Sequence, residues 1–381
     1  MPRLIKYMIA LFVLVCIAFA VFFLSRSPVA VGFAGPLTGP YSDLGVHGRN
    51  GVRLAVEEIN ARGGINGRRL ELEVRDDKGT VDGAKEATAG LIESGVVAVI
   101  GHMTSQQSMS ALPVATEMDT VLLSPTTSTP ELTGIKDNFF RVHPGIDRSA
   151  RALALFASEE RSKNQLCTII DMDNEYYTGS YKNHFVQEFK SRGGKVLYKK
   201  EIRSSSRPDW HYIVQDLLKC SSKGFFMSLS ARDTASLVQA VQAIGVTAEL
   251  FSSGWAMTGE LQRVGGRTVE GMVFSSSTFQ EEPRPAFQTF QEHYRGRFGE
   301  KPSFAAAFAY DATQVLALAL KKTGGRKSGL KKALTGIQDY PGLYWPISID
   351  EYGDVTSPQY IIQIQNGKFQ TVQKLESQEL R

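Results

Sequence analysis

Two stretches decide the fold of this chain: VIGHMTSQQS at residues 99–108 and VLLSPTTST at residues 121–129. Each begins as an apolar run of strand type and then breaks into a cluster of hydroxyl side chains. Unbroken apolar runs are typical of strands that are buried on both faces of a parallel sheet. Residues 106–118, between the two runs, have a helical pattern. Together they predict a strand, a helix and a second, parallel strand.

The same alternation precedes these stretches. VAVGFAG at residues 29–35 predicts a strand, and apolar residues at helical spacing predict a helix over residues 45–62. GGINGRR at residues 63–69 ends that helix and turns the chain into LELEVRD at residues 70–76, which alternates as a strand. These units predict a doubly wound α/β domain, with helices on both faces of a parallel sheet.

A second series of the same kind follows FFRVHPGID at residues 139–147. Its predicted strands are LCTIID (166–171), KVLYKKEI (195–202), GFFMSLS (224–230), AELFSSG (248–254) and GMVFSSS (271–277). Its predicted helices are residues 148–160, 180–192, a run that ends at Cys220, and 232–245, followed by 284–298 and 303–323. A hairpin at residues 360–373, with Asn366-Gly367 as its turn, closes the chain. The chain of 381 residues is long enough for two domains.

The first 27 residues form a separate unit. Arg3 and Lys6 precede an apolar run from Tyr7 to Leu24, and polar residues follow it. This pattern predicts an export signal, either a cleaved signal peptide or an uncleaved anchor, and both place the rest of the chain outside the cytoplasm. Residues 27–381 carry a net charge of only +1. That balance gives no support for a nucleic-acid surface, and we expect no nucleic-acid partner.

Cys167 and Cys220 can be oxidised in an exported chain. Cys167 opens a predicted strand and Cys220 closes a predicted helix just before the next strand, so both lie at the same edge of a parallel sheet. A disulfide and two separate buried thiols are both consistent with this placement. The sequence contains no C-x-x-C pair and no pair of histidines at ligand spacing, so we expect no metal site and no cofactor.

Hydroxyl side chains gather where the predicted strands end. In open α/β sheets, ligands bind in the crevice outside the carboxyl ends of the strands, and helix N-termini there favour anions. Such a crevice would be lined by Thr104, Ser105, Thr126, Thr127 and Ser128. Serine and threonine at these places also cap the following helix, and one residue can do both. The cluster therefore predicts either helix caps or a site for a small anionic ligand.

Several motifs together resemble the branched-chain amino acid binding protein family, the type I periplasmic solute-binding proteins of ABC importers. The motifs are GPLTGPYSDLG (35–45), GVRLAVEEINARGGINGRRLELEVRDDKG (51–79), VIGHMTSQQS (99–108), LLSPTTSTPELTG (122–134) and FFRVHPGIDRSA (139–150). The resemblance runs from about Val29 to the C-terminus. It implies two lobes joined by a three-stranded hinge that close over a ligand. The expected division is residues 1–27 as signal or anchor, 28–146 plus 276–349 as lobe 1, and 147–275 plus 350–381 as lobe 2.

The resemblance also implies ligand-binding residues. A ligand carboxylate would meet Ser105, Thr126 and Ser128, beside Thr104, and Tyr176 of DNEYYTG would cover the ligand from the second lobe. Leu44 falls where an aromatic wall residue often lies in the family. Trp255 of SSGWA could supply an aromatic surface from the other lobe.

One feature departs from the family pattern. Amino-acid-binding relatives hold the α-ammonium with an acid from the second lobe, but the matching stretch near Gly254 has no carboxylate. The family's preceding aromatic residue falls near Leu229 or Ser230. Burial of an ammonium without a counter-charge is costly. Two ligand classes therefore remain: an amino acid, with Asp173 or Asp233 as the counter-charge, or an aromatic or aliphatic acid without an ammonium.

Catalytic patterns are weak in this chain. The sequence has no G-x-S-x-G elbow and no P-loop, and His102 matches the family's ordinary strand ending, so we expect no enzymatic activity. The expected function is capture of a carboxylate-bearing solute for the permease of an ABC importer by a monomer in the periplasm. An uncleaved N-terminal helix would anchor it to the outer face of the inner membrane. The alternative is a membrane-tethered sensor that reports ligand to a signalling partner.

Overall fold

The computed structural model describes residues 27–375 apart from 162–163, 221, 223 and 279–283, together with residues 7, 8 and 13. Most of the predicted export signal therefore lies outside the described residues. Within the described part, we find no helix that is both long and apolar enough to cross a membrane.

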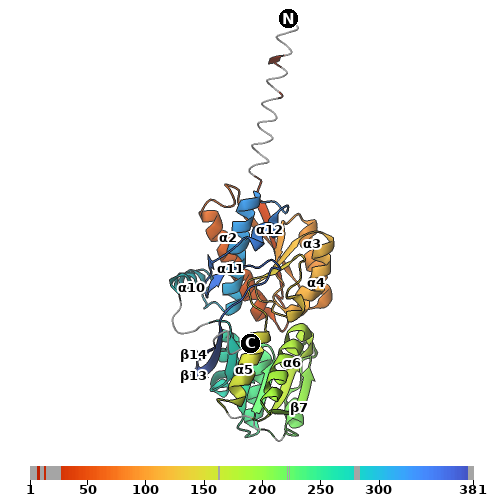
Figure 1. The fold of residues 1–381 in the computed structure, drawn as a ribbon, viewed down its shortest axis with the longest axis vertical. Helices are drawn as coiled ribbons and strands as arrows, with labels where there is room; N and C mark the ends of the chain where they lie inside the picture. Colours follow the sequence, from red (N-terminus) through yellow and green to blue (C-terminus); the bar gives the residue numbers. More distant parts are fainter. Residues whose placement is uncertain are drawn as a thin grey trace.

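The first sheet is entirely parallel, with strand order β2-β1-β3-β4-β5. Its strands are β1 (Val29–Gly35), β2 (Leu70–Asp76), β3 (Ala98–Ile100), β4 (Val121–Ser124) and β5 (Phe139–Arg141). Its helices are α2 (Ser42–Ala61), α3 (Val81–Glu93), α4 (Ser105–Glu117), α10 (Pro285–Phe298), α11 (Phe304–Thr323) and α12 (Leu330–Thr335). We call this sheet with its helices lobe 1, the upper part of Figure 1.

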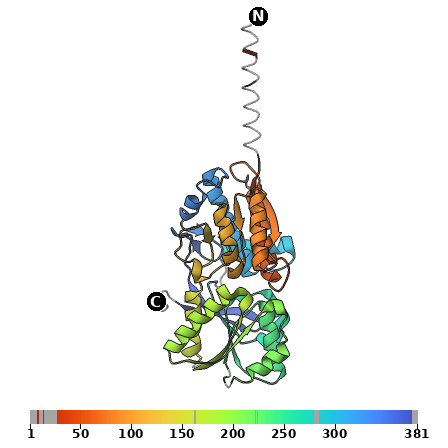
Figure 2. The same cartoon turned by 90° about the vertical axis from the view of Figure 1, so that its right-hand side faces the viewer.

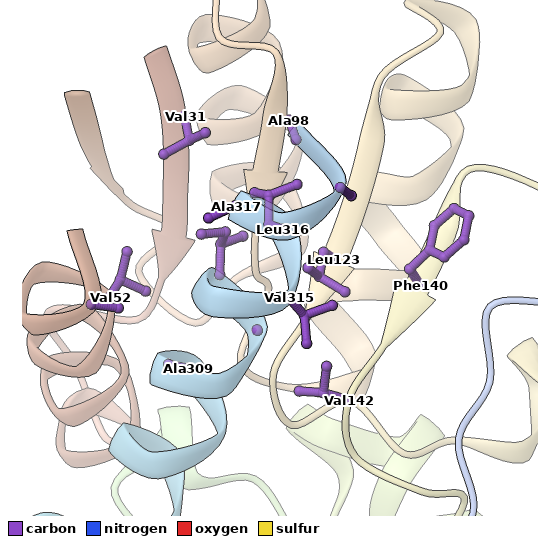
Figure 3. Packing of buried hydrophobic residues seen from close by; sticks show 14 of the residues in the cluster. Val31, Val52, Ala98, Leu123, Phe140, Val142, Ala309, Val315, Leu316 and Ala317 are labelled. Atoms are coloured by element: carbon purple, nitrogen blue, oxygen red, sulfur yellow. The ribbon is translucent and has the colours of Figure 1, made fainter. Parts of the chain in front are cut away.

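Alternate residues of these strands face opposite layers, as strand geometry requires. One face packs against α2 and α11, and Figure 3 shows Val31, Ala98 and Leu123 turned toward Leu316 of α11. The other face packs against α3 and α4, where Val99 is among the buried residues. Both faces are apolar, which explains why the strands read as unbroken apolar runs.

The second sheet has the order β14-β13-β10-β9-β8-β6-β7. Its strands are β6 (Gln165–Asp171), β7 (Lys195–Ile202), β8 (Gly224–Ser228), β9 (Glu249–Ser252), β10 (Val273–Ser276), β13 (Gln359–Gln365) and β14 (Lys368–Leu375). Strand β13 runs antiparallel to both of its neighbours, β10 and β14, and the other strand pairs are parallel. Its helices are α5 (Asp147–Ser158), α6 (Glu175–Ser191), α7 (Trp210–Leu217), α8 (Ala231–Ala243) and α9 (Gly259–Gly265). We call this group lobe 2, the lower part of Figures 1 and 2.

The chain passes between the lobes three times: after β5, after β10 and before β13. Lobe 1 also contains the short pair β11 (Tyr340–Pro341) and β12 (Pro346–Ile347). Single turns of 3-10 helix occur at η1 (Pro130–Leu132), η2 (Met172–Asn174), η3 (Ser204–Ser206), η4 (Gly254–Ala256) and η5 (Gly266–Val269). The predicted fold class, two parallel α/β lobes with a three-segment connection, is confirmed.

The structure also decides between the alternatives for the cysteines. Cys167 in β6 and Cys220 after α7 form a disulfide across 53 residues of sequence. Both residues are buried in the same apolar cluster of lobe 2. The disulfide therefore ties β6 to the segment that enters β8, its neighbour in the sheet.

Candidate functional site

A cavity of about 390 Å³ lies between the lobes. Its wall from lobe 1 comes from the loops after β3 and β4 and from the start of α11. The wall from lobe 2 comes from α6, from η4 with the residues that follow it, and from the end of β10. Six of the eight predicted site residues line it: Leu44, Thr104, Ser105, Thr126, Ser128 and Trp255.

The hydroxyl cluster forms one polar end of this cavity. Thr126 Oγ1 donates to the carbonyl of Met103 at 2.6 Å, and the amide of Ser128 donates to Ser105 Oγ at 3.4 Å. These two hydrogen bonds join the loop after β4 to the loop after β3. Ser128 is 1% exposed, and its own Oγ has no hydrogen-bond partner among the described residues. Ser105 is the first residue of α4, and the side chain of its N-cap residue, Thr104, makes no capping hydrogen bond to this helix. The cluster thus presents the unpaired hydroxyl of Ser128 beside the N-terminus of α4.

His102 lies behind the hydroxyl cluster and holds it in place. Its Nδ1 is 2.6 Å from Asp77 Oδ2 and its Nε2 is 2.8 Å from Thr88 Oγ1, all fully buried. Its carbonyl accepts a hydrogen bond from Ser124 Oγ at 2.7 Å. His102 is not among the residues that line the cavity. This placement agrees with the structural role that the sequence favours for it.

The prediction for Tyr176 was in error by one residue. Tyr176 is 37% exposed and lies outside the cavity wall, whereas its neighbour Tyr177 lines the cavity. The family resemblance assigned Tyr176 from the motif DNEYYTG alone, whereas both tyrosines lie in the first turn of α6, which begins at Glu175 and not near residue 180 as predicted. Consecutive residues on a helix point about 100° apart, so only one of the two tyrosines can face the cleft.

Ser230 also lies away from the cavity wall. It is the N-cap of α8, and its hydroxyl accepts a hydrogen bond from the amide of Asp233 at 3.2 Å. For Ser230 the structure therefore shows a helix cap and not a residue of the cavity wall.

Sequence reasoning missed several cavity residues, which lie on the connections between the lobes, near the start of α11, and on α5 and α6. They include His143, Ser149, Tyr181, Ser277, Ser303 and Phe308. Most of these residues do not directly follow a predicted strand, so the ends of the strands did not point to them. The HPG motif after β5 was the one available signal for His143.

His143 is an uncharged member of the cavity wall. Burial lowers its pKa to about 4, so the ring is neutral at neutral pH. Its Nδ1 is 3.0 Å from the carbonyl of Pro144, which makes this nitrogen the donor and leaves Nε2 as an acceptor. Its ring meets Phe308 edge-on, with centroids 4.9 Å apart.

The charged residues that line the cavity in the described part of the chain are basic. Lys301 and Lys368 line it, and no aspartate or glutamate does so among the residues with a described position. The two acids considered as partners for an ammonium are engaged elsewhere. Asp173 pairs with Arg203 at 3.1 Å, and Asp233 contacts Ser204.

The lobes touch each other beside the cavity. Tyr41 Oη of lobe 1 donates to Asp171 Oδ2 of lobe 2 at 2.6 Å, in a buried position. Burial, and then the nearby Asp171 carboxylate, raises the pKa of Tyr41 well above its usual value, so the phenol remains a donor. The amide of Gln106 also donates to Asn174 Oδ1 at 3.1 Å. These hydrogen bonds join the two lobes beside the cavity.

Comparison with known proteins gives consistent results. The sequence profile of a family described as "Periplasmic binding protein" matches residues 28–368. A leucine-, isoleucine-, valine-, threonine- and alanine-binding protein from Pseudomonas aeruginosa is 23% identical over 309 residues, which are 80% of this chain and 81% of the relative.

Two solved structures illustrate the shared fold. A leucine-binding protein from Thermotoga maritima has a TM-score of 0.84 at 24% identity, covering 92% of this chain and 100% of that one. A solute-binding protein of an ABC transporter from Rhodopseudomonas palustris, in complex with 3,4-dihydroxybenzoic acid, has a TM-score of 0.81 at 21% identity, covering 92% and 98%. The family resemblance predicted from the sequence motifs is confirmed.

Proposed function

This chain belongs to the periplasmic binding protein family, and on that premise we propose that it captures a small carboxylate without an ammonium group and delivers it to an ABC importer. The family implies a location in the periplasm. The observation that carries the proposal is the unpaired, buried hydroxyl of Ser128 at the N-terminus of α4, in a cavity wall where no described residue is acidic.

The polar end of the cavity suits a carboxylate. Helix N-termini carry partial positive charge and free amide N–H groups, which favour anions. Ser128 and Ser105 add hydroxyl donors within the same buried corner. A carboxylate would satisfy the unpaired hydroxyl, which otherwise costs free energy in the buried site.

The rest of the cavity suits an apolar body and not an ammonium. Trp255, Tyr177 and Tyr181 present aromatic surfaces from lobe 2. Aromatic rings contribute a large contact area and specific ring geometry to an apolar ligand. An ammonium would lose its water here, and the acids described near the cleft are already paired.

Closure of the lobes would complete the site. Because both lobes contribute walls, a ligand binds the closed form better than the open one and shifts the population toward it. Contacts such as Tyr41 with Asp171 would form on closure. We propose residues 28–146 plus 276–349 as one rigid body and 147–275 plus 350–381 as the other, with the closed form docking on the permease.

The test compares ligands that differ only in the ammonium group. The full chain is unfolded, refolded without ligand, and titrated with leucine against isocaproate and with phenylalanine against hydrocinnamate. We expect the ammonium-free acids to raise the melting temperature more; at 100 times the dissociation constant, binding adds about 2.7 kcal/mol. Ser128→Ala should weaken binding by about 1–3 kcal/mol. Stronger binding of both amino acids than of their counterparts would refute the proposed ligand class.

A further inference from the structure

We propose that the N-terminus of α11 forms a second anion subsite in the same cavity, so that the preferred ligand is a dicarboxylate with an apolar spacer. This inference rests on the proposed function, since it adds a second pole to the carboxylate site at α4. Its central residue is Ser303, the N-cap of α11.

Ser303 carries a hydroxyl that has no described partner. The residue is 8% exposed and lines the cavity, and its Oγ is buried without a hydrogen bond to any described group. An N-cap serine ordinarily accepts a hydrogen bond from an amide in the first turn, but this one does not. By contrast, the N-cap hydroxyl of Thr80 accepts from the amide of Gly83. Ser303 therefore brings an unpaired hydroxyl to the wall of the cavity.

The helix behind Ser303 favours negative charge. α11 has 20 residues, and its first turn reads FAAA, without an acid that would offset the positive end of the helix dipole. Lys301, two residues earlier, also lines the cavity, and we find no ion pair for it among the described residues. Lys301, the unpaired hydroxyl of Ser303 and the N-terminus of α11 thus lie within a few residues of one another in the cavity wall. A cation and hydrogen-bond donors of this kind bind carboxylates.

The position of this helix start is tightly set. A Cβ atom on Gly51 of α2 would lie 2.1 Å from the carbonyl oxygen of Ala306, so only glycine allows the two helices to approach this closely. The contact holds the first turn of α11 against the body of lobe 1. The subsite is therefore built into the rigid part of the lobe.

The two poles are separate places in the cavity. α11 packs on one face of the first sheet, and α4 packs on the opposite face. We infer that the two N-termini bind separate carboxylate groups. The lining beside each pole is apolar, with Met103 next to Thr104 at the first, and Phe304 and Phe308 after Ser303 at the second. Two anionic ends joined by an apolar body match this arrangement.

The test uses isothermal titration of the refolded full chain with straight-chain acids. Dicarboxylates from glutarate to sebacate are each compared with the monocarboxylate of the same carbon number. We expect at least one dicarboxylate to bind about tenfold more tightly than its partner. Ser303→Ala should lower dicarboxylate affinity about tenfold and monocarboxylate affinity much less, so that the dicarboxylate preference is lost; an equal loss in both series would argue against the subsite.

Further variants separate this subsite from the first pole. Ser303→Thr, which keeps the hydroxyl, should retain the dicarboxylate preference, and Lys301→Ala should reduce it. Thr80→Ala, an N-cap change outside the cavity, should leave both ligand series unchanged. If monocarboxylates bind as tightly as dicarboxylates, the second subsite is wrong and the first pole stands. If leucine binds and neither acid series does, the proposed function fails and the second subsite fails with it.

Discussion

Replacing Tyr41 with phenylalanine tests lobe closure, because it removes one hydrogen bond between the lobes and little else. The phenol of Tyr41 donates to Asp171 at 2.6 Å, while its ring packs against Trp255 with centroids 5.2 Å apart. Phenylalanine keeps the ring contact and loses the hydroxyl. If the lobes open without ligand, this hydrogen bond exists only in the closed form.

The size of the effect follows from the surroundings of Asp171. A hydrogen bond to a charged group contributes about 1.5–3 kcal/mol net. Asp171 keeps other donors, namely the amide of Asp173 at 3.0 Å and the amide of Ser204 at 3.2 Å. The carboxylate is therefore not left unpaired, and we expect the lower value, about 1.5 kcal/mol, which corresponds to about a tenfold loss of ligand affinity.

Tyr310→Phe is the matched control for this experiment. Tyr310 Oη donates to the carboxylate of Glu58 at the same distance, 2.6 Å, but both residues belong to lobe 1. Both variants should lower the melting temperature of the unliganded chain by little, and only Tyr41→Phe should raise the dissociation constant measured by calorimetry. Equal ligand affinity in the two variants would show that the Tyr41 contact takes no part in closure.

Three other variants test the site, the disulfide and a buried acid. Tyr177→Ala should weaken ligand binding by about tenfold or more in calorimetry, while Tyr176→Ala should change it less than twofold, and the reverse order would contradict the assignment of the cavity wall. Replacing Cys167 and Cys220 with alanine should cost about 4 kcal/mol in urea unfolding, the value expected for a closed loop of 53 residues, and a loss below about 1 kcal/mol would argue against it. Burial raises the pKa of Asp311 to about 8, so the wild type should lose stability relative to Asp311→Asn as the pH rises from about 4 to 8, by an amount on the order of 5 kcal/mol; parallel pH profiles would refute this.

The sequence by itself determined the elements of the fold and one end of the cavity. Periodicity is a local property, so apolar runs such as residues 29–35 indicated strands, and the spacing along residues 45–62 indicated α2. Because ligands bind at the carboxyl ends of parallel strands, the hydroxyls after β3 and β4 could be named from their position alone. Thr104, Ser105, Thr126 and Ser128 are therefore the part of the cavity wall that position at the strand ends could predict.

Only the tertiary structure decided which other groups meet these hydroxyls. The first turn of α6 turns Tyr177 inward and Tyr176 outward, a choice that depends on where the helix begins. Ser303 comes into the cavity, although 175 residues separate it from Ser128, through the packing of α11 against α2. Tyr41 meets Asp171 across the two lobes, 130 residues apart in the sequence. Such neighbours depend on strand order, helix start and lobe orientation, which are set by long-range packing and not by the local sequence pattern.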